Sequence, residues 1–279
     1  MNPLSSYLRK PEIYVKLPSG GKWWPQGTID IPPNGELPVM AMNGHNDITM
    51  RNADGLMNGA SSVEVIQSCV PNISDAWAGP NMDIEYLFIA LRIASYGSEM
   101  DMEKSCSKCK ESTKFGINLQ NVLENMNFPD FEVPVSLGEL YIMLKPASYH
   151  LTNLTAQEIF EQQRAIMATS SSDLTLEQQE KILKESITKL SKITVSKLVE
   201  YIDYVMLPDG SKVTDPVYIQ EFIDEVNRKD FNLLKKGIDD KNKQYGSPDL
   251  PFRCSNTECN HEETFKFEFN PSNFFAADS

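Results

Sequence analysis

The sequence predicts an α+β protein, in which a mixed N-terminal domain is followed by a β element whose two halves flank a mainly helical insertion. Three observations support this: short alternating segments broken by Pro and Gly near the N-terminus, apolar residues at helical spacing further along, and two cysteine pairs that each precede an alternating segment. Of the 279 residues, 41% are hydrophobic, which is enough to bury an ordinary core. We expect the N-terminal domain over 1–100, the β element over 101–145 and 246–279, and the insertion over 146–245.

The first 45 residues favour extended structure and loops. Alternation over 13–17 predicts a strand that ends at the turn cluster 18–21, where two glycines accept positive φ. Residues 37–42 predict a second strand, with its proline near the start or on a sheet edge. Together these segments predict a small β element rich in loops.

Two helices are predicted next. Ser61 and Glu64 fit a capping box that opens a short helix, and because Cys69 lies in the apolar stripe of that helix we expect a buried structural thiol. Residues 81–96 are apolar on most sides, which predicts a central core helix. Arg92, near its end, then needs a carboxylate or carbonyl partner if it is buried.

Residues 146–245 have a different, helical character. Thr155 with Glu158 and Thr175 with Gln178 form two further capping-box patterns, which predict the starts of long helices rich in Gln, Glu and Lys. The second of these helices carries its apolar residues close to a single stripe. A stripe of this kind favours packing against a core over a cofactor site.

The charge balance bears on the class of partner. Lys and Arg number 26 against 39 Asp and Glu, a net charge of −13, and no run of basic residues exceeds two. This disfavours duplex nucleic acid and anionic membrane surfaces as partners, because neutralising phosphates drives both kinds of binding. No apolar run approaches the roughly 20 residues that span a bilayer, and the start lacks the apolar stretch of a secretory signal. We therefore expect a soluble protein of a cytoplasm-like compartment.

Catalytic signatures are absent from the sequence. It contains no dinucleotide-binding or phosphate-binding glycine motif, no zinc-protease motif and no serine-hydrolase elbow. Its three histidines, His45, His150 and His261, leave few candidates for acid–base chemistry. We expect neither an enzymatic activity nor a small-molecule substrate.

Two cysteine pairs form the one constellation that carries chemistry. Cys106 and Cys109 precede one strand-like segment, and Cys254 and Cys259 precede another, so that each half is a cysteine knuckle leading into a strand. Two such knuckles suit a tetrahedral Zn²⁺ bound by four thiolates, and His261 could replace either cysteine of the second pair. The alternative is four unligated thiols. Because a closed four-thiolate site leaves no position for water, the split zinc-ribbon-like element would stabilise the fold and not catalyse.

Four aromatic residues are candidates for contact with partner proteins. Trp23 and Trp24 are adjacent in the N-terminal loops, and Phe274 and Phe275 lie near the C-terminal end. Buried aromatics dominate the energetics of interfaces, which makes both pairs possible anchors. The alternative for each pair is packing in the protein's own core.

The order of the motifs resembles a known family. The segments that carry the resemblance are 16–24, 39–42, 52–59, 92–97 and the knuckle of Cys106 and Cys109. In this order they resemble a family of baseplate proteins of T-even-type, contractile-tailed bacteriophages, whose members are hub-associated components or assembly factors of the tail baseplate. The resemblance covers residues 10–119 and extends to the second knuckle.

The resemblance implies a non-enzymatic structural component of a phage tail baseplate. Its partners would be other baseplate or tail subunits, and it would reside in the virion after assembly in the host cytoplasm. Two alternatives remain: a baseplate assembly chaperone that is absent from the mature virion, and a zinc-ribbon adaptor that binds nucleic acid.

Overall fold

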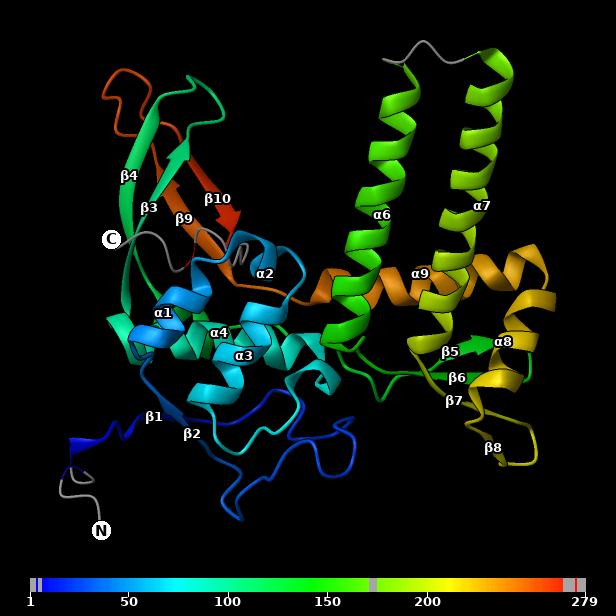
Figure 1. The fold of residues 1–279 in the computed structure, drawn as a ribbon, viewed down its shortest axis with the longest axis horizontal. Coiled ribbons are helices and arrows are strands. Elements are labelled where there is room, and N and C mark those ends of the chain that lie inside the picture. Colours follow the sequence, from blue (N-terminus) through cyan, green and yellow to red (C-terminus); the bar gives the residue numbers. More distant parts are fainter. Residues whose placement is uncertain (1–3, 5–6, 171–174, 268–273, 275–279) are drawn as a thin grey trace. The chain divides into compact units, whose positions relative to one another are not determined.

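The computed structural model describes the chain outside residues 1–3, 5–6, 171–174, 268–273 and 275–279. It confirms the predicted α+β class, with small antiparallel sheets and several helices (Figure 1). The chain forms two compact units: unit 1 comprises Met1–Phe128 with Gln244–Ser279, and unit 2 comprises Pro129–Lys243. Unit 2 is therefore an insertion within unit 1.

The insertion begins earlier than residue 146 because its sheet needs strands from before the first long helix. Strand β6 (Leu140–Leu144) pairs with β7 (Ile202–Met206) beyond the two long helices, and β5 (Val135–Leu137) pairs with β6. Residues 129–145 consequently belong to unit 2 and not to the β element of unit 1.

Unit 1 combines a helical body with two β-hairpins. The body consists of β1 (Pro11–Val15), β2 (Leu37–Met40), α1 (Gly44–Met50), α2 (Ala53–Met57), α3 (Ala60–Cys69), the 3₁₀ helix η2 (Ala76–Ala78), α4 (Asn81–Tyr96) and α5 (Leu119–Glu124). The hairpins are β3 (Glu99–Ser105) with β4 (Ser112–Asn118), and β9 (Asp249–Arg253) with β10 (Glu262–Lys266). The two predicted N-terminal strands form the antiparallel pair β1–β2.

Helix α4 is the core helix of unit 1, as predicted. Its apolar side chains are buried on several sides, and it packs against α3, α5 and the β1–β2 pair. Arg92 on this helix is 1% exposed, and its Nη1 donates to the backbone carbonyl of Phe274 at 2.9 Å. The predicted carbonyl partner of this buried cation is thereby confirmed. The helix ends at Gly97, whose φ of 88° is the left-handed value that glycine accepts most easily.

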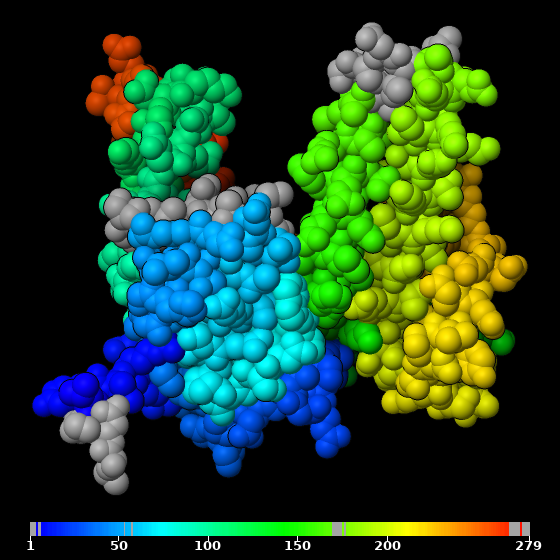
Figure 2. Space-filling model, in the orientation of Figure 1, coloured from blue at the N-terminus to red at the C-terminus, as the bar shows by residue number. Residues whose placement is uncertain are grey.

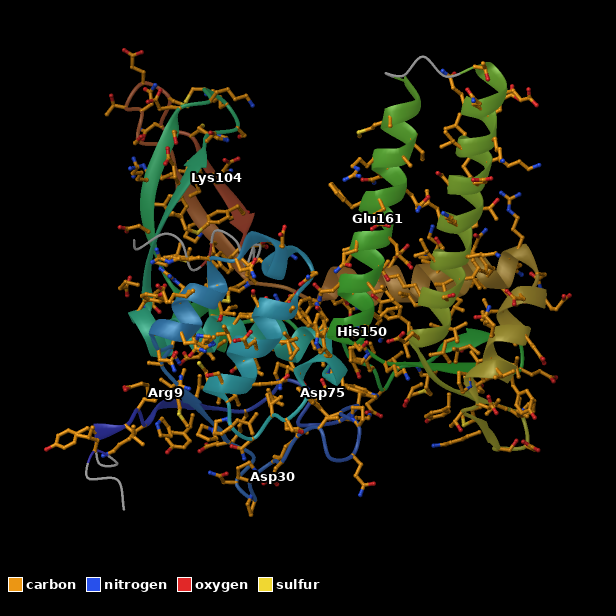
Figure 3. The ribbon with its side chains drawn as sticks, in the orientation of Figure 1. Arg9, Asp30, Asp75, Lys104, His150 and Glu161 are labelled. Atoms are coloured by element: carbon orange, nitrogen blue, oxygen red, sulfur yellow. The ribbon has the colours of Figure 1, made fainter. Side chains whose placement is uncertain are left out.

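Cys69 is a fully buried thiol at the end of α3, also as predicted. Its Sγ lies 3.4 Å from Nη1 of Arg9, which is labelled in Figure 3. The same guanidinium donates to the carbonyl of Ser68 at 2.7 Å. Arg9 thus ties the segment that precedes β1 to the end of α3.

Two of the three predicted capping boxes are wrong. Helix α3 begins after Gly59, which has φ 79°, and Ser61 is buried inside the first turn, where it is 3% exposed. Thr155 is 4% exposed within α6, and the hydroxyl of Ser148 accepts the early backbone N–H of that helix instead. A Ser or Thr three residues before a Glu also occurs inside helices, where its side chain packs against neighbouring residues and does not cap the helix end. The box of Thr175 with Gln178 is confirmed at the start of α7.

Unit 2 contains a long helix pair and a four-stranded sheet of order β5-β6-β7-β8. Its helices are α6 (Tyr149–Ser170), α7 (Leu176–Glu200), α8 (Pro216–Glu225) and α9 (Arg228–Gln244), and β8 is Lys212–Val213. Figure 1 shows α6 and α7 as an antiparallel pair within this unit. Among the described residues, no helix is both long and apolar enough to cross a membrane.

Candidate metal centre

The four paired cysteines meet at the tips of the two hairpins of unit 1. Cys106 and Cys109 lie in the turn between β3 and β4, and Cys254 and Cys259 lie in the turn between β9 and β10. The hairpins lie side by side in Figure 1, and their tips form one protrusion, coloured green and orange, in Figure 2. Cysteine pairs with 144 residues between them in the chain are thereby brought together.

The first knuckle is a tight turn closed by backbone hydrogen bonds. The N–H of Cys106 donates to the carbonyl of Glu111 at 2.9 Å, and the N–H of Lys110 donates to the carbonyl of Cys106 at 3.0 Å. Lys110 has φ 64°, the left-handed conformation that turns the chain back into β4.

The second knuckle repeats this design with two more residues. The N–H of Cys254 donates to the carbonyl of His261 at 2.9 Å, and the N–H of Asn260 donates to the carbonyl of Asn256 at 2.9 Å. Asn260, which follows Cys259, has φ 46°. The residue after the second cysteine is therefore left-handed in both knuckles, and asparagine tolerates that conformation better than most residues.

The geometry of the sulfur atoms fits one tetrahedral ion. All four Sγ atoms lie within 4.8 Å of one another, with Cys106 to Cys259 at 3.9 Å and Cys109 to Cys254 at 3.5 Å. Four sulfurs at about 2.3 Å from a central zinc would be about 3.8 Å apart. A disulfide needs about 2.05 Å, so none of these contacts is a covalent bond. The four cysteines can hold a metal ion.

An aromatic cluster lies beneath the sulfur atoms. Cys106 and Cys254 are buried against Phe252, with Phe115 and Phe265 packed beside it. The ring of Phe115 makes edge-on contacts with the rings of Phe252 and Phe265, at centroid distances of 5.4 and 5.6 Å. This small core joins the two hairpins and keeps water away from one side of the cysteines.

The surroundings of the four thiols disfavour ionising all of them to thiolates at once. The backbone N–H of Cys109 donates to the sulfur of Cys106 and lowers the pKa of that thiol to about 7. Burial, together with the neighbouring thiols of Cys109 and Cys106, raises the pKa of Cys254 to about 12. Burial also raises the pKa of Cys259. Four thiolates therefore require a cation between them, which is the role that a divalent metal would fill.

His261 is engaged beside the cluster. Its Nε2 lies 3.2 Å from the hydroxyl of Ser107 and 3.9 Å from Oε2 of Glu263. Among the described residues, the side chains that lie close enough together to hold one metal ion are the four cysteines. His261 is not part of that group.

An ion pair crosses between the hairpins below the knuckles. Nζ of Lys104, which is labelled in Figure 3, lies 2.9 Å from Oε1 of Glu263 and 5.0 Å from the ring centre of Phe252. Several effects, of which hydrogen bonding from Lys104 is the largest, lower the pKa of the Glu263 carboxyl to about 2. Glu263 is therefore ionised at neutral pH.

Sequence reasoning placed Lys104 in a positive patch around the first knuckle but missed Thr113 and Glu263 as members of this site. Alternation puts Thr113 on the same face of its strand as Phe115, and Glu263 on the same face as Phe265, which is the signal that the sequence offers. Alternation alone does not say which face meets the other hairpin, because that depends on the pairing register and on the packing of the two hairpins.

The candidate partner-binding aromatics have diverse environments. Trp24 is 9% exposed in the core of unit 1, where its Nε1 donates to Oδ2 of Asp83 at 2.7 Å. Phe274 is 2% exposed, with its ring 5.4 Å from the guanidinium of Arg92. Trp23 is half-buried, and the ammonium of Lys22 lies 4.7 Å from its ring. Phe275 lies outside the described residues. For Trp24 and Phe274, the environment is that of core residues of unit 1.

Comparison with known proteins identifies the family. A family model described as "T4 bacteriophage base plate protein" matches residues 50–276, which include both knuckles and all of unit 2. Neither the curated proteins nor the solved structures give a significant match. The match covers most of the helical body and the entire candidate metal centre. The chain therefore belongs to the family of T4 bacteriophage base plate proteins.

Proposed function

We propose that the protein is a non-enzymatic structural component of the tail baseplate of a contractile-tailed phage, associated with the baseplate hub and stabilised by one structural zinc ion. The family match over residues 50–276 is the observation that carries this proposal. The closed arrangement of four cysteines supports the structural role, because it leaves no coordination position for substrate or water.

The zinc would join two parts of unit 1 that are far apart in the chain. Each hairpin has two strands, and an isolated two-stranded hairpin is marginally stable in water. Binding one ion across both tips would add its free energy to the folding of the pair. The four thiolates would hold the ion, and the small aromatic core would shield one side of it.

The proposed partners are other baseplate or tail subunits, bound during assembly in the host cytoplasm and retained in the virion. Among the described residues of unit 1, Trp23 is the remaining candidate anchor, since its side chain is half-buried while Trp24 and Phe274 fill the core. In unit 2, α6 exposes Phe160 at 51% and Met167 at 71% of their surface. Exposed apolar side chains of this size suit contact with another protein.

The composition of purified particles tests the structural role. Phage tails would be purified from infected cells and their proteins quantified by mass spectrometry against the known baseplate subunits of the same particle. We expect this chain in finished particles at a constant ratio to those subunits.

Two results would contradict the proposal. If the chain accompanies assembly intermediates and is absent from finished particles, it is an assembly chaperone. If the purified chain is retained on DNA or RNA at low salt and released as salt rises, it is a nucleic-acid adaptor.

A further inference from the structure

Two polar contacts cross between the hairpins directly below the knuckles. Each joins a residue beside the first cysteine of one knuckle to a side chain of the opposite hairpin. Thr113 contacts Ser255, which follows Cys254, and Glu263 contacts Lys104, two residues before Cys106.

Thr113 on β4 holds the second knuckle. Its Oγ1 accepts the backbone N–H of Ser255 at 3.1 Å and lies 3.0 Å from the Ser255 hydroxyl. Thr113 is only 5% exposed, so that water cannot readily replace it as the partner of this N–H. Because Ser255 directly follows Cys254, the contact determines where the chain places that sulfur.

Glu263 on β10 contacts the strand that leads into the first knuckle. Its Oε1 accepts a hydrogen bond from the ammonium of Lys104 at 2.9 Å, and Lys104 lies on β3 two residues before Cys106. The Lys104 and Glu263 side chains are 27% and 20% exposed, which makes the ion pair partly shielded from solvent.

The strand registers place both contacts on the facing sides of the two hairpins. Lys104 and Thr113 are directly opposite one another in the β3–β4 ladder, and Glu263 is opposite Phe252 in the β9–β10 ladder. Opposite residues of an antiparallel pair project from the same face. Both pairs therefore lie on the faces that meet between the hairpins, with the phenylalanine cluster below them and the cysteines above.

We propose that Thr113 and Glu263 are positioning residues of the metal site. Thr113 holds the second knuckle, and Glu263, through Lys104, holds the strand that leads into the first, so that the four sulfur atoms surround one position before an ion binds. This inference rests on the proposed zinc function. Partners of this kind, one step removed from the metal, orient the ligands and contribute strongly to affinity. This role also explains why the hydroxyl of Thr113 and the carboxylate of Glu263 lie in an otherwise apolar interface between the hairpins.

Zinc affinity of full-length, reduced protein tests the role of Thr113. Thr113→Val keeps the shape of the side chain and removes the acceptor, so we expect the zinc affinity, measured by competition with a chromophoric chelator, to fall about 10- to 100-fold. Thr113→Ser restores the hydroxyl and is expected to bind zinc nearly as tightly as the unchanged protein. Thr264→Val, on the exposed face of β10, is the matched control and should leave the affinity unchanged.

The corresponding test of Glu263 uses Glu263→Gln, with Glu262→Gln on the exposed face as its control. We expect a similar loss of affinity for Glu263→Gln alone. Co²⁺ bound in place of zinc adds a spectroscopic readout, since its visible bands report the symmetry of the four sulfurs and should change in Thr113→Val and Glu263→Gln but not in the controls.

Each outcome separates the inference from the function on which it rests. If the unchanged protein binds one zinc and both variants bind it as tightly and with the same Co²⁺ spectrum, the positioning role is refuted while the zinc site stands. If the variants lose thermal stability equally with and without metal but keep their affinity, the two residues serve packing only and the inference again fails. If the unchanged protein binds no zinc, the proposed zinc function itself is refuted.

Discussion

At the scale of single residues, the chain separates its five cysteines into two environments. Four meet at the hairpin tips, and Cys69 is buried alone at the end of α3 beside Arg9. The spacing of the pairs predicted this division, because two pairs that each precede a strand indicate knuckles, whereas a single cysteine in an apolar stripe indicates a core position.

Replacing one knuckle cysteine tests the division. In Cys106→Ser or Cys254→Ser we expect zinc content to fall from about one ion per chain to near zero, with a lower melting temperature, because three thiolates no longer close the site. Metal analysis by mass spectrometry and thermal unfolding would measure both. Cys69→Ala is the control: it should lose stability through its cavity and keep its zinc. Absence of zinc from freshly purified, reduced protein would contradict the prediction.

Asp83 on α4 predicts a pH dependence of stability. Burial raises the pKa of its carboxyl, although Ser19 and the Trp24 indole donate hydrogen bonds to it. An acid whose pKa is higher in the folded state than in the unfolded state binds more protons when folded, so its contribution to stability rises as the pH falls through the folded pKa towards 3.8.

We therefore expect the unchanged protein to gain stability relative to Asp83→Asn as the pH falls from neutral towards 3.8. Urea unfolding of both proteins at each pH measures this difference, and comparing two zinc-loaded proteins cancels the common effect of acid on the metal. A difference that stays constant or changes in the opposite sense would show that Asp83 has no raised pKa. Asp75→Asn, at the cap of η2, is a control on a carboxylate nearer the surface.

At the scale of elements, the helix ends differ in how they depend on the local sequence. The start of α7 is set locally, because the Thr175 hydroxyl accepts the N–H of Gln178 and the Gln178 side chain accepts the N–H of Thr175. The start of α3 depends on Gly59 in a left-handed conformation and on the burial of Ser61, neither of which a short pattern shows.

Removing the cap of α7 should destabilise unit 2. Thr175→Ala is expected to lower the free energy of unfolding by about 1 kcal/mol, the usual effect of losing a threonine cap. Thr188→Ala, at an exposed position inside the same helix, should be neutral or slightly stabilising because alanine has the higher helix propensity. Urea unfolding followed by circular dichroism measures both variants. Equal effects of the two substitutions would show that the cap contributes nothing.

At the scale of the whole molecule, unit 2 is inserted into unit 1 through two connecting segments that lie next to each other. The backbone of Asn127 donates to Gly246 at 2.9 Å and accepts from it at 3.1 Å, so the points where the chain leaves and re-enters unit 1 are neighbours. The metal centre can therefore form from segments separated by 144 residues, because the entropy of closing a loop grows only slowly with its length.

This arrangement predicts that unit 1 folds without the insertion. A variant in which residues 129–243 are replaced by a short Gly/Ser linker should remain folded and bind about one zinc ion, because the linker needs to span only neighbouring ends. Circular dichroism and zinc analysis measure this. If baseplate assembly fails in a phage carrying this folded variant, unit 2 makes the contacts that assembly needs; normal assembly would exclude that role. A variant that is unfolded even with excess zinc would contradict the prediction.

Local patterns are enough to predict the mixed class, the core helix α4, the cysteine knuckles and the cap of α7. Each depends on periodicity or spacing within a few residues, where backbone geometry leaves few alternatives. Other features emerge only from the folded chain: residues 129–145 join unit 2, Trp24 and Phe274 fill the core, and Thr113 and Glu263 contact the opposite hairpin. These features depend on strand register and on contacts between segments far apart in the chain, which local patterns do not encode.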